Sequence, residues 1–476
     1  MSSIQYDPAS LCTMATAHGQ GHLFNFFEEL PEAGREKLLK QIASLEFSVV
    51  DRLIAQFIHG AGQLPCEGGK IEPAPVLTIP ATPEEQQAEQ AARTAGTAAL
   101  REGRVGCFLV AGGQGTRLGI QGPKGAFKIG PVTERTLFQL HAEKILALRR
   151  RYQAPIPWLI MTSDANDAET CAFLLQNKCF GLGMDTVRIF KQANMPAVDP
   201  EGRILLQAKD EIALSPNGHG GAIKALHDAG LLHWLKRQGV DTLSYFQVDN
   251  VLVKIGDPVF IGHHVLARSQ ISTKVCRKRD WQEKVGLLCQ RGGRLCVLEY
   301  SDLPDSLAQE TDAAGALKYW AGSIAIHILD VGFVGELNRG GFQLPYHKAE
   351  KAVPCVGPDG NPAALQPGEK NAIKFETFIF DALPYAERTV VLETPRQEDF
   401  SPVKNPAGED SPATAQRDLM ELYARWLASA GTKVPRKKKD GTLNCRLEIS
   451  PLTSLEGEGL EGKAPKRIKV GTDVVL

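Results

Sequence analysis

The sequence predicts a three-layer α/β fold, in which helices cover both faces of a central sheet. From about residue 105, short apolar runs alternate with amphipathic stretches, as in VGCFLV followed by TLFQLHAEKILALRRRY. This alternation of strand and helix patterns is typical of α/β domains. A glycine-rich loop, VAGGQGTRLGIQGPKG at 110–125, ends the first of these apolar runs. Because α/β sheets bind ligands at the carboxyl ends of their strands, this loop is the first candidate site.

The residues before this region predict helices and a connector. Apolar residues recur at spacings of three and four through 8–60, as on the buried face of a helix. The segment 60–80 is rich in Gly and Pro, which predicts a connector. A further helix is expected over 81–103, with Pro83 near its start and Gly103 at its end. We therefore expect an N-terminal helical segment at 1–104.

The later apolar runs complete a central domain at 105–425. After about residue 270 they become more strand-like, with KVCRKR, VGLLCQ, RLCVLEY, YWAGSIAIHIL and RTVVLET. The remainder, 426–476, consists of short polar segments. Its basic run PRKKK at 435–439 is interpreted as a solvated turn because it is isolated.

Composition excludes several classes of protein. The 476 residues carry a formal net charge of -1, and without a basic stripe a nucleic-acid partner is not expected. No apolar run of about 18 residues is present, which predicts no membrane span. The 10 cysteines form no CxxC pair and are interpreted as reduced, packed thiols. A soluble, cytoplasmic protein is expected.

The glycine loop matches neither of two common phosphate-binding patterns. The dinucleotide fingerprint GxGxxG fails because Leu118 stands three residues after Gly115, which argues against an oxidoreductase. The P-loop pattern fails because Gly125 follows Lys124 instead of preceding it. The loop nevertheless combines close-approach glycines with Arg117 and Lys124 at fixed offsets. Backbone N–H groups and two cationic side chains suit a polyphosphate.

The segment AGGQGTRLG…PKG resembles the signature loop of sugar-nucleotide pyrophosphorylases, and among them the eukaryotic-type uridylyltransferases that make UDP-N-acetylglucosamine and related UDP-sugars. Weaker similarities follow in the family's order, in FKQANMPAV, SPNGHGGAIKAL, YFQVDN, VLEYSD, WAGSIAIH, NAIKFETF, FSPVKN and EISPLTSLEGEGLE. The resemblance implies a nucleotidyltransferase fold (GT-A or Rossmann-like) with a mixed sheet. It also implies a small C-terminal β domain at 426–476.

The resemblance implies roles for individual residues. Catalytic roles fall to Arg117, Lys124 and Lys404. Nucleotide contacts fall to Gly112, Gly113, Gly115, Thr116, Gln192, Gly218, His219 and Gly220. Substrate contacts fall to Asp249, Asn250, Gly286, Glu299, Ser323, His327 and Lys374. Asp249 is also the implied Mg2+ ligand, a single carboxylate completed by phosphate oxygens and water. For His219 a plain loop histidine, and for His327 a buried core histidine, remain open alternatives.

The implied reaction joins UTP and a sugar 1-phosphate into a UDP-sugar and releases pyrophosphate. N-acetylglucosamine 1-phosphate is the expected sugar. Glucose 1-phosphate or another sugar remains an alternative, because Ser323 stands where the N-acetylglucosamine enzymes carry asparagine and because Gly218-His219-Gly220 is a form found in other uridylyltransferases. A non-catalytic UTP-binding protein is the more distant alternative. The residues Arg117, Lys124 and Asp249 argue against it.

Overall fold

The chain forms two compact units, and each is built from separated stretches of sequence. The computed structural model describes residues 7–60, 69–300, 302–341, 344–366 and 368–476. The first unit takes residues from 1–67, 192–221 and 344–381, and the second takes 68–191, 222–343 and 382–476. This division does not follow the consecutive segments 1–104, 105–425 and 426–476 that we expected. Side chains distant in sequence bury against one another, and local composition does not record such contacts.

The first unit combines helices with small antiparallel sheets. The helices are α1 (Pro8–Ala17), α2 (Glu32–Ala43) and α3 (Phe47–Phe57), so the helices expected over 8–60 are confirmed. The strands are β5 (Asn194–Pro196), β6 (Leu206–Ala208), β7 (Glu211–Ile212), β8 (Leu214–Pro216), β14 (Tyr346–Lys351) and β15 (Ala372–Thr377). Leu38 and Ile42 of α2 share one apolar core with Val198 and with Phe375 of β15. The late segments therefore complete the core that the N-terminal helices begin.

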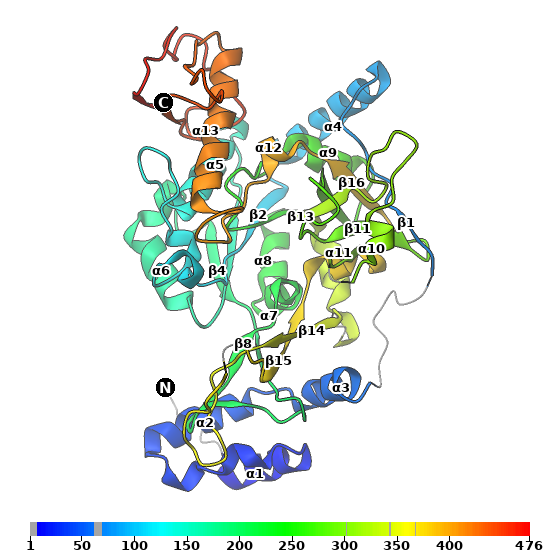
Figure 1. Ribbon diagram of the computed structural model, residues 1–476, viewed down its shortest axis with the longest axis vertical. Coiled ribbons are helices and arrows are strands. Elements are labelled where there is room, and N and C mark those ends of the chain that lie inside the picture. The colour runs from blue at the N-terminus through cyan, green and yellow to red at the C-terminus, as the bar shows by residue number, and fades with distance from the viewer. Residues whose placement is uncertain (1–6, 61–68, 301, 342–343, 367) are drawn as a thin grey trace. The chain divides into compact units, whose positions relative to one another are not determined.

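The second unit is built on a mixed sheet of ten strands (Figure 1). They are β1 (Ile71–Pro73), β2 (Val105–Val110), β3 (Trp158–Thr162), β4 (Val187–Lys191), β9 (Thr242–Gln247), β10 (Ile271–Arg277), β11 (Leu287–Arg291), β12 (Arg294–Leu298), β13 (Ala321–Asp330) and β16 (Thr389–Glu393). β2 runs parallel to β3 and β9, whereas β13 runs antiparallel to β9 and β10. The expected mixed sheet is confirmed.

Helices lie against both faces of this sheet. On one face, Cys107 and Leu109 of β2 share a core with helices α4 (Pro83–Arg101), α5 (Leu137–Tyr152) and α9 (Pro258–Leu266). Phe108 points to the other face, where its ring lies 5.8 Å from that of Phe190. Helices α7 (Ala222–Asp228), α8 (Leu231–Arg237) and α11 (Val331–Leu337) contact one another, and α7 contacts β4. Alternating side chains of one buried strand thus serve two helical layers.

Helices α4 and α9 cross at backbone contact. A Cβ built on Gly96 would lie 1.9 Å from the carbonyl oxygen of Pro258, and one on Gly262 would lie 1.7 Å from that of Ala92. Glycine is therefore required at both positions. The helix that we expected to close the N-terminal segment belongs instead to the second unit.

The structure differs from our expectations for two segments, 60–80 and 426–476. The presumed connector at 60–80 contributes β1, which pairs with β11, because three residues in extended form suffice to extend an antiparallel sheet. The C-terminal region does not separate as its own compact unit. Its strands are β17 (Arg446–Glu448) and β18 (Asp473–Val475), which pair in parallel after helix α13 (Pro412–Ser429). The rest of 426–476 is mostly turns, held by packing on α13.

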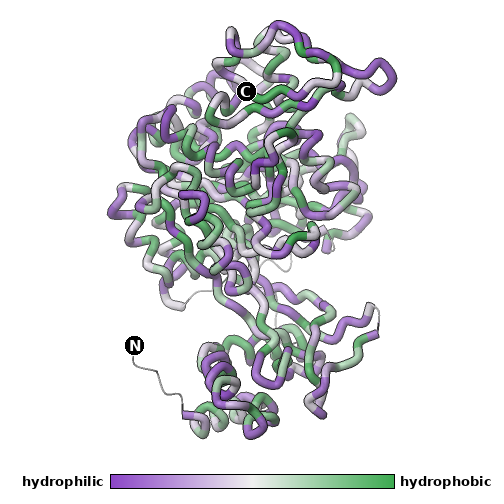
Figure 2. The backbone as a smooth tube through the Cα atoms, turned by 90° about the vertical axis from the view of Figure 1, so that its left-hand side faces the viewer, coloured by the Kyte–Doolittle hydropathy of each residue, from purple (hydrophilic) through white to green (hydrophobic). Residues whose placement is uncertain are grey.

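Hydrophobic and hydrophilic segments alternate along the described part of the chain (Figure 2). No helix in the described part of the chain is long and apolar enough to cross a membrane.

Candidate functional site

The glycine loop leaves β2 at its carboxyl end and is tied to the neighbouring turn after β3. The Ser163 hydroxyl donates to the carbonyl of Gly112 at 2.7 Å. The Asn166 amide donates to the carbonyls of Ala111 at 2.8 Å and Gly113 at 3.1 Å. Because Ser163 and Asn166 hold these carbonyl groups, the shape of the loop is fixed before a ligand binds.

The outer part of the loop turns back on itself and faces solvent. The Gly115 N–H donates to the Gly122 carbonyl at 2.9 Å, and the Lys124 N–H donates to the Gly113 carbonyl at 3.2 Å. Thr116 and Arg117 lie exposed in the short helix η3 (Thr116–Leu118). Among the described atoms, none lies within 4 Å of a Cβ built on Gly113. The space beside this glycine is therefore open to a ligand.

Lys124 and Asp249 meet at the carboxyl ends of β2 and β9. The Lys124 Nζ lies 2.8 Å from Asp249 Oδ2, and both side chains are largely buried. Burial raises the pKa of Asp249, but the positive charges of Lys124 and Lys404 outweigh it, so the pKa of this carboxyl lies below its usual value. The Asp249 side chain is thus ionised and lies next to the glycine loop.

The segment 399–404 is hydrogen-bonded to the residues that follow β9. The Asn250 amide donates to the Asp399 carbonyl at 2.7 Å and accepts from the Ser401 N–H at 3.0 Å. The Val403 N–H donates to the Asp249 carbonyl at 3.0 Å. These bonds bring Lys404 to the site, while the Asn250 side chain is engaged with the backbone. A substrate contact by Asn250 stays a prediction.

Beneath this segment lies a buried ion network that the sequence analysis missed. Lys274 of β10 is 1% exposed and pairs with Asp257 at 2.7 Å and with Asp399. Attraction to these carboxylates outweighs burial and raises the pKa of Lys274, while the pKa of Asp257 falls to about 2. One signal was available in the sequence. A lysine inside the apolar strand ISTKVC needs a buried anionic partner.

Three of the predicted sugar-contact residues come together where β11, β12 and β13 meet. The Ser323 N–H donates to the Gly286 carbonyl at 2.8 Å. A Cβ built on Gly286 would lie 3.7 Å from Glu299 Oε1. His327 lies deeper in β13, fully buried, with its ring 5.4 Å from that of Tyr245. A substrate contact by His327 therefore stays a prediction.

The other predicted residues, Gln192, Gly218, His219, Gly220 and Lys374, belong to the first unit. Gln192 follows β4 and is 6% exposed. Lys374 lies on β15 opposite Ala349 of β14.

The glycines of the GHG turn serve packing inside this unit. A Cβ built on Gly218 would lie 2.3 Å from the carbonyl oxygen of Thr377, and one on Gly220 would lie 2.6 Å from the Phe378 nitrogen. The backbone of this turn thus lies close to the end of β15. A nucleotide contact by these residues is a further prediction.

His219 is neutral in this turn. The Ile379 N–H donates to His219 Nδ1 at 3.2 Å, which leaves the ring proton on Nε2. Burial, and then the nearby His347, lower the pKa of His219 to about 4. At neutral pH its ring therefore carries no charge.

Similarity to known proteins extends over most of the chain. A family model described as UTP–glucose-1-phosphate uridylyltransferase matches residues 80–410. The chain is 36% identical to UDP-N-acetylhexosamine pyrophosphorylase-like protein 1 of Mus musculus, over 93% of this chain and 92% of that one. It is 34% identical to UDP-N-acetylglucosamine pyrophosphorylase of Saccharomyces cerevisiae, over 93% and 94%. A crystal structure of the Trypanosoma brucei UDP-N-acetylglucosamine pyrophosphorylase with an inhibitor superposes with a TM-score of 0.82 at 27% identity, covering 99% of each chain.

Proposed function

The chain belongs to the UTP–glucose-1-phosphate uridylyltransferase family, and on that premise we propose that it transfers the uridylyl group of UTP to N-acetylglucosamine 1-phosphate. The products are UDP-N-acetylglucosamine and pyrophosphate. The observation that carries the proposal is the buried pair of Lys124 and Asp249 beside the open glycine loop. The choice of sugar rests on relatives named for N-acetylglucosamine at 34% identity.

In the proposed reaction a phosphate oxygen of the sugar 1-phosphate attacks the α-phosphorus of UTP. A new P–O bond forms as the bond to the β-phosphate oxygen breaks, and pyrophosphate leaves. The attacking oxygen is already ionised near pH 7, so the step needs no protein base. The enzyme's contribution is then orientation and charge stabilisation.

The residues divide this task by position. Backbone N–H groups of the glycine loop and the exposed Arg117 hold the β- and γ-phosphates. Lys124, held in place by Asp249, faces the α-phosphate. Lys404, which is 45% exposed, steadies the incoming sugar phosphate. Gly286, Glu299 and Ser323 form the proposed sugar contact.

Asp249 fits the proposed Mg2+. Within the described ranges, no group of three or more His, Cys, Asp and Glu side chains forms a complete metal site. A single ionised carboxylate suits Mg2+, which typically binds one or two carboxylates together with substrate phosphates and water. When bound, Mg2+ neutralises phosphate charge. We place the protein in the cytoplasm, in line with the reduced state of its nine described cysteines.

The test is pyrophosphate release with UTP, Mg2+ and a panel of sugar 1-phosphates, with and without EDTA. We expect release with N-acetylglucosamine 1-phosphate that EDTA abolishes. A preference for glucose 1-phosphate would contradict the sugar assignment and direct attention to Ser323. Release that persists in EDTA would contradict the role of Mg2+, and no release with any sugar would refute the transferase.

A further inference from the structure

The buried ammonium of Lys274 holds together two carboxylates from different parts of the chain. Asp257 precedes α9, and Asp399 ends the short helix α12 (Arg396–Asp399). Both carboxylates contact Lys274 Nζ, which is almost completely buried. Removing one partner of a buried ion pair leaves an uncompensated charge, which is strongly unfavourable. Without Lys274, two buried carboxylates would face each other.

Asp399, which Lys274 holds in place, forms hydrogen bonds with the residues around it. Its Oδ1 accepts from the Lys254 N–H at 2.8 Å, and its Oδ2 accepts from the Thr394 hydroxyl at 3.0 Å. Its carbonyl accepts from the Asn250 amide at 2.7 Å. A shift of the Asp399 side chain would therefore disturb the segment that follows Asp249.

A short ladder connects Asp399 with the proposed catalytic groups. The Val251 N–H donates to the Ser401 carbonyl at 3.2 Å, and the Val403 N–H donates to the Asp249 carbonyl at 3.0 Å. One side of this ladder carries Asp249, and the other continues into Lys404. The separation of these two groups therefore depends on the pairing of 249–251 with 401–403.

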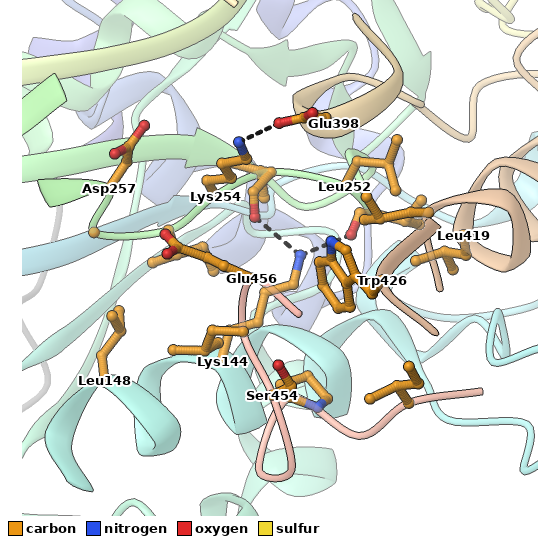
Figure 3. Close-up of a pocket in the computed structure, with 18 of the residues that line it drawn as sticks. Lys144, Leu148, Leu252, Lys254, Asp257, Glu398, Leu419, Trp426, Ser454 and Glu456 are labelled. Carbon is orange, nitrogen blue, oxygen red and sulfur yellow. Dashed lines mark hydrogen bonds and ion pairs between the residues drawn. The ribbon is translucent and has the colours of Figure 1, made fainter. Parts of the chain in front are cut away.

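The opposite side of the 249–254 segment is held from α5. Lys144 donates to the carbonyls of Val251 at 2.7 Å and Val253 at 2.9 Å, and the Lys254 side chain turns away to Glu398 at 2.7 Å (Figure 3). Both of these hydrogen bonds of Lys144 go to the 249–254 segment. Lys274 acts on Asp399, which bonds to both segments.

We propose that Lys274 is a positioning residue of the transferase, which sets the geometry of Asp249 and Lys404 through Asp399 and the ladder 249–251/401–403. This inference rests on the proposed function. It assigns Lys274 no contact with substrate.

A cavity beside Lys274 makes a direct test possible. Lys254, Asp257, Lys274 and Thr394 line a cavity of about 520 Å3 that is open to solvent. In a Lys274→Ala variant, a small alkylammonium ion can enter from this side and occupy the space of the missing ammonium. If Lys274 acts by orienting Asp399, the added alkylammonium ion should restore the geometry of Asp249 and Lys404 although it is not covalently attached.

The experiment compares wild type, Lys274→Ala and Lys254→Ala in pyrophosphate release over a range of Mg2+ concentrations. Lys254 lines the same cavity but directs its side chain to Glu398, so it is the matched control. We expect kcat of Lys274→Ala to fall about 10²-fold, as a misplacement on the order of 1 Å does. Ethylammonium or propylammonium should restore at least a tenth of the wild-type kcat, propanol should not, and Lys254→Ala should change kcat less than twofold.

Several outcomes would overturn the inference. These are an unchanged kcat in folded Lys274→Ala, an equal loss in Lys254→Ala, or a loss that no alkylammonium reverses. If Lys274→Ala does not fold, Thr394→Val replaces it, because it deletes only the hydroxyl bond to Asp399. That variant must raise the Mg2+ concentration for half-maximal rate about threefold at an unchanged melting temperature, and an unchanged Mg2+ dependence refutes the inference.

Failure of the proposed function can be distinguished from failure of the positioning role. If the proposed function is wrong, the wild-type protein shows no turnover, and UTP binding with Mg2+ is then compared between wild type and Lys274→Ala by calorimetric titration. Equal binding by wild type and Lys274→Ala would refute the positioning role independently.

Discussion

Glycines in the two glycine-rich loops of this chain have opposite surroundings at Gly113 and at Gly218 and Gly220. In the loop after β2, the space beside Gly113 is free of described atoms to 4 Å. In the turn at 217–221, a Cβ on Gly218 or Gly220 would collide with the backbone of Thr377 and Phe378. Gly113 therefore lies beside open space, whereas Gly218 and Gly220 pack against the fold, as Gly115 and Gly125 of the first loop also do against Ile120 and Phe138. Glycine content alone does not separate a binding loop from a packing loop.

The largest expected effect belongs to the loop after β2, which we propose binds the phosphates, and it concerns the turnover rate. Lys124→Ala should lower turnover about 10²- to 10³-fold, because it removes a preorganised cation beside the reacting phosphate. Lys128→Ala is the matched control, since Lys128 is exposed and pairs with Glu134. Steady-state pyrophosphate release and thermal melting measure both variants. Near-normal turnover in Lys124→Ala would remove the catalytic assignment.

A substitution in the turn at 217–221 should lower the free energy of unfolding. Gly220→Ala forces a Cβ into the Phe378 backbone, and overpacking of this kind costs about 1–3 kcal/mol. Urea unfolding of the variant beside Gly113→Ala measures the difference. If both glycine variants lost the same stability, the contrast between the two loops would be wrong.

His219, in the turn at 217–221, should make the free energy of unfolding depend on pH. Its folded pKa of about 4 lies below the ordinary value, so the unfolded chain takes up the proton more readily. Its contribution to stability is therefore complete above about pH 6.5 and declines as pH falls toward 4, by about 3 kcal/mol. His219→Gln should flatten this part of the stability profile, measured by urea unfolding from pH 7 to 4. An unaltered slope would show that another group titrates.

The smallest effect is expected at Gly113. Gly113→Ala should change unfolding free energy by less than about 0.5 kcal/mol, as surface substitutions usually do. The KM for UTP should rise by less than about tenfold, because the methyl group partly fills the open space. Kinetics with varied UTP measures this change. An unchanged KM would place the phosphates elsewhere in the loop.

The sequence predicted most of the second unit because its strands and helices carry local patterns. VGCFLV and TLSYFQ are apolar runs of strand length, and both form buried parallel strands. The roles of Lys124 and Asp249 came from the family resemblance, and their ion pair agrees with the rule that parallel strands end at one edge of the sheet.

What could not be predicted depends on contacts between distant residues. Lys274 and Asp399 are 125 residues apart, and neither has a local pattern that identifies its partner. The three residues of β1 are too few to show a period. The packing role of Gly220 is visible only once Phe378 lies against it.

The discontinuous first unit limits how this chain can be recombined with its relatives. Its core joins Leu38 and Ile42 with Val198 and Phe375, which come from three separate stretches of the chain. A chimera made with one crossover between residues 67 and 344 would pair helices from one parent with strands from another in the same core. Exchanging this unit as a module requires three coordinated replacements, at 1–67, 192–221 and 344–381. Its helices and strands are therefore expected to be inherited together.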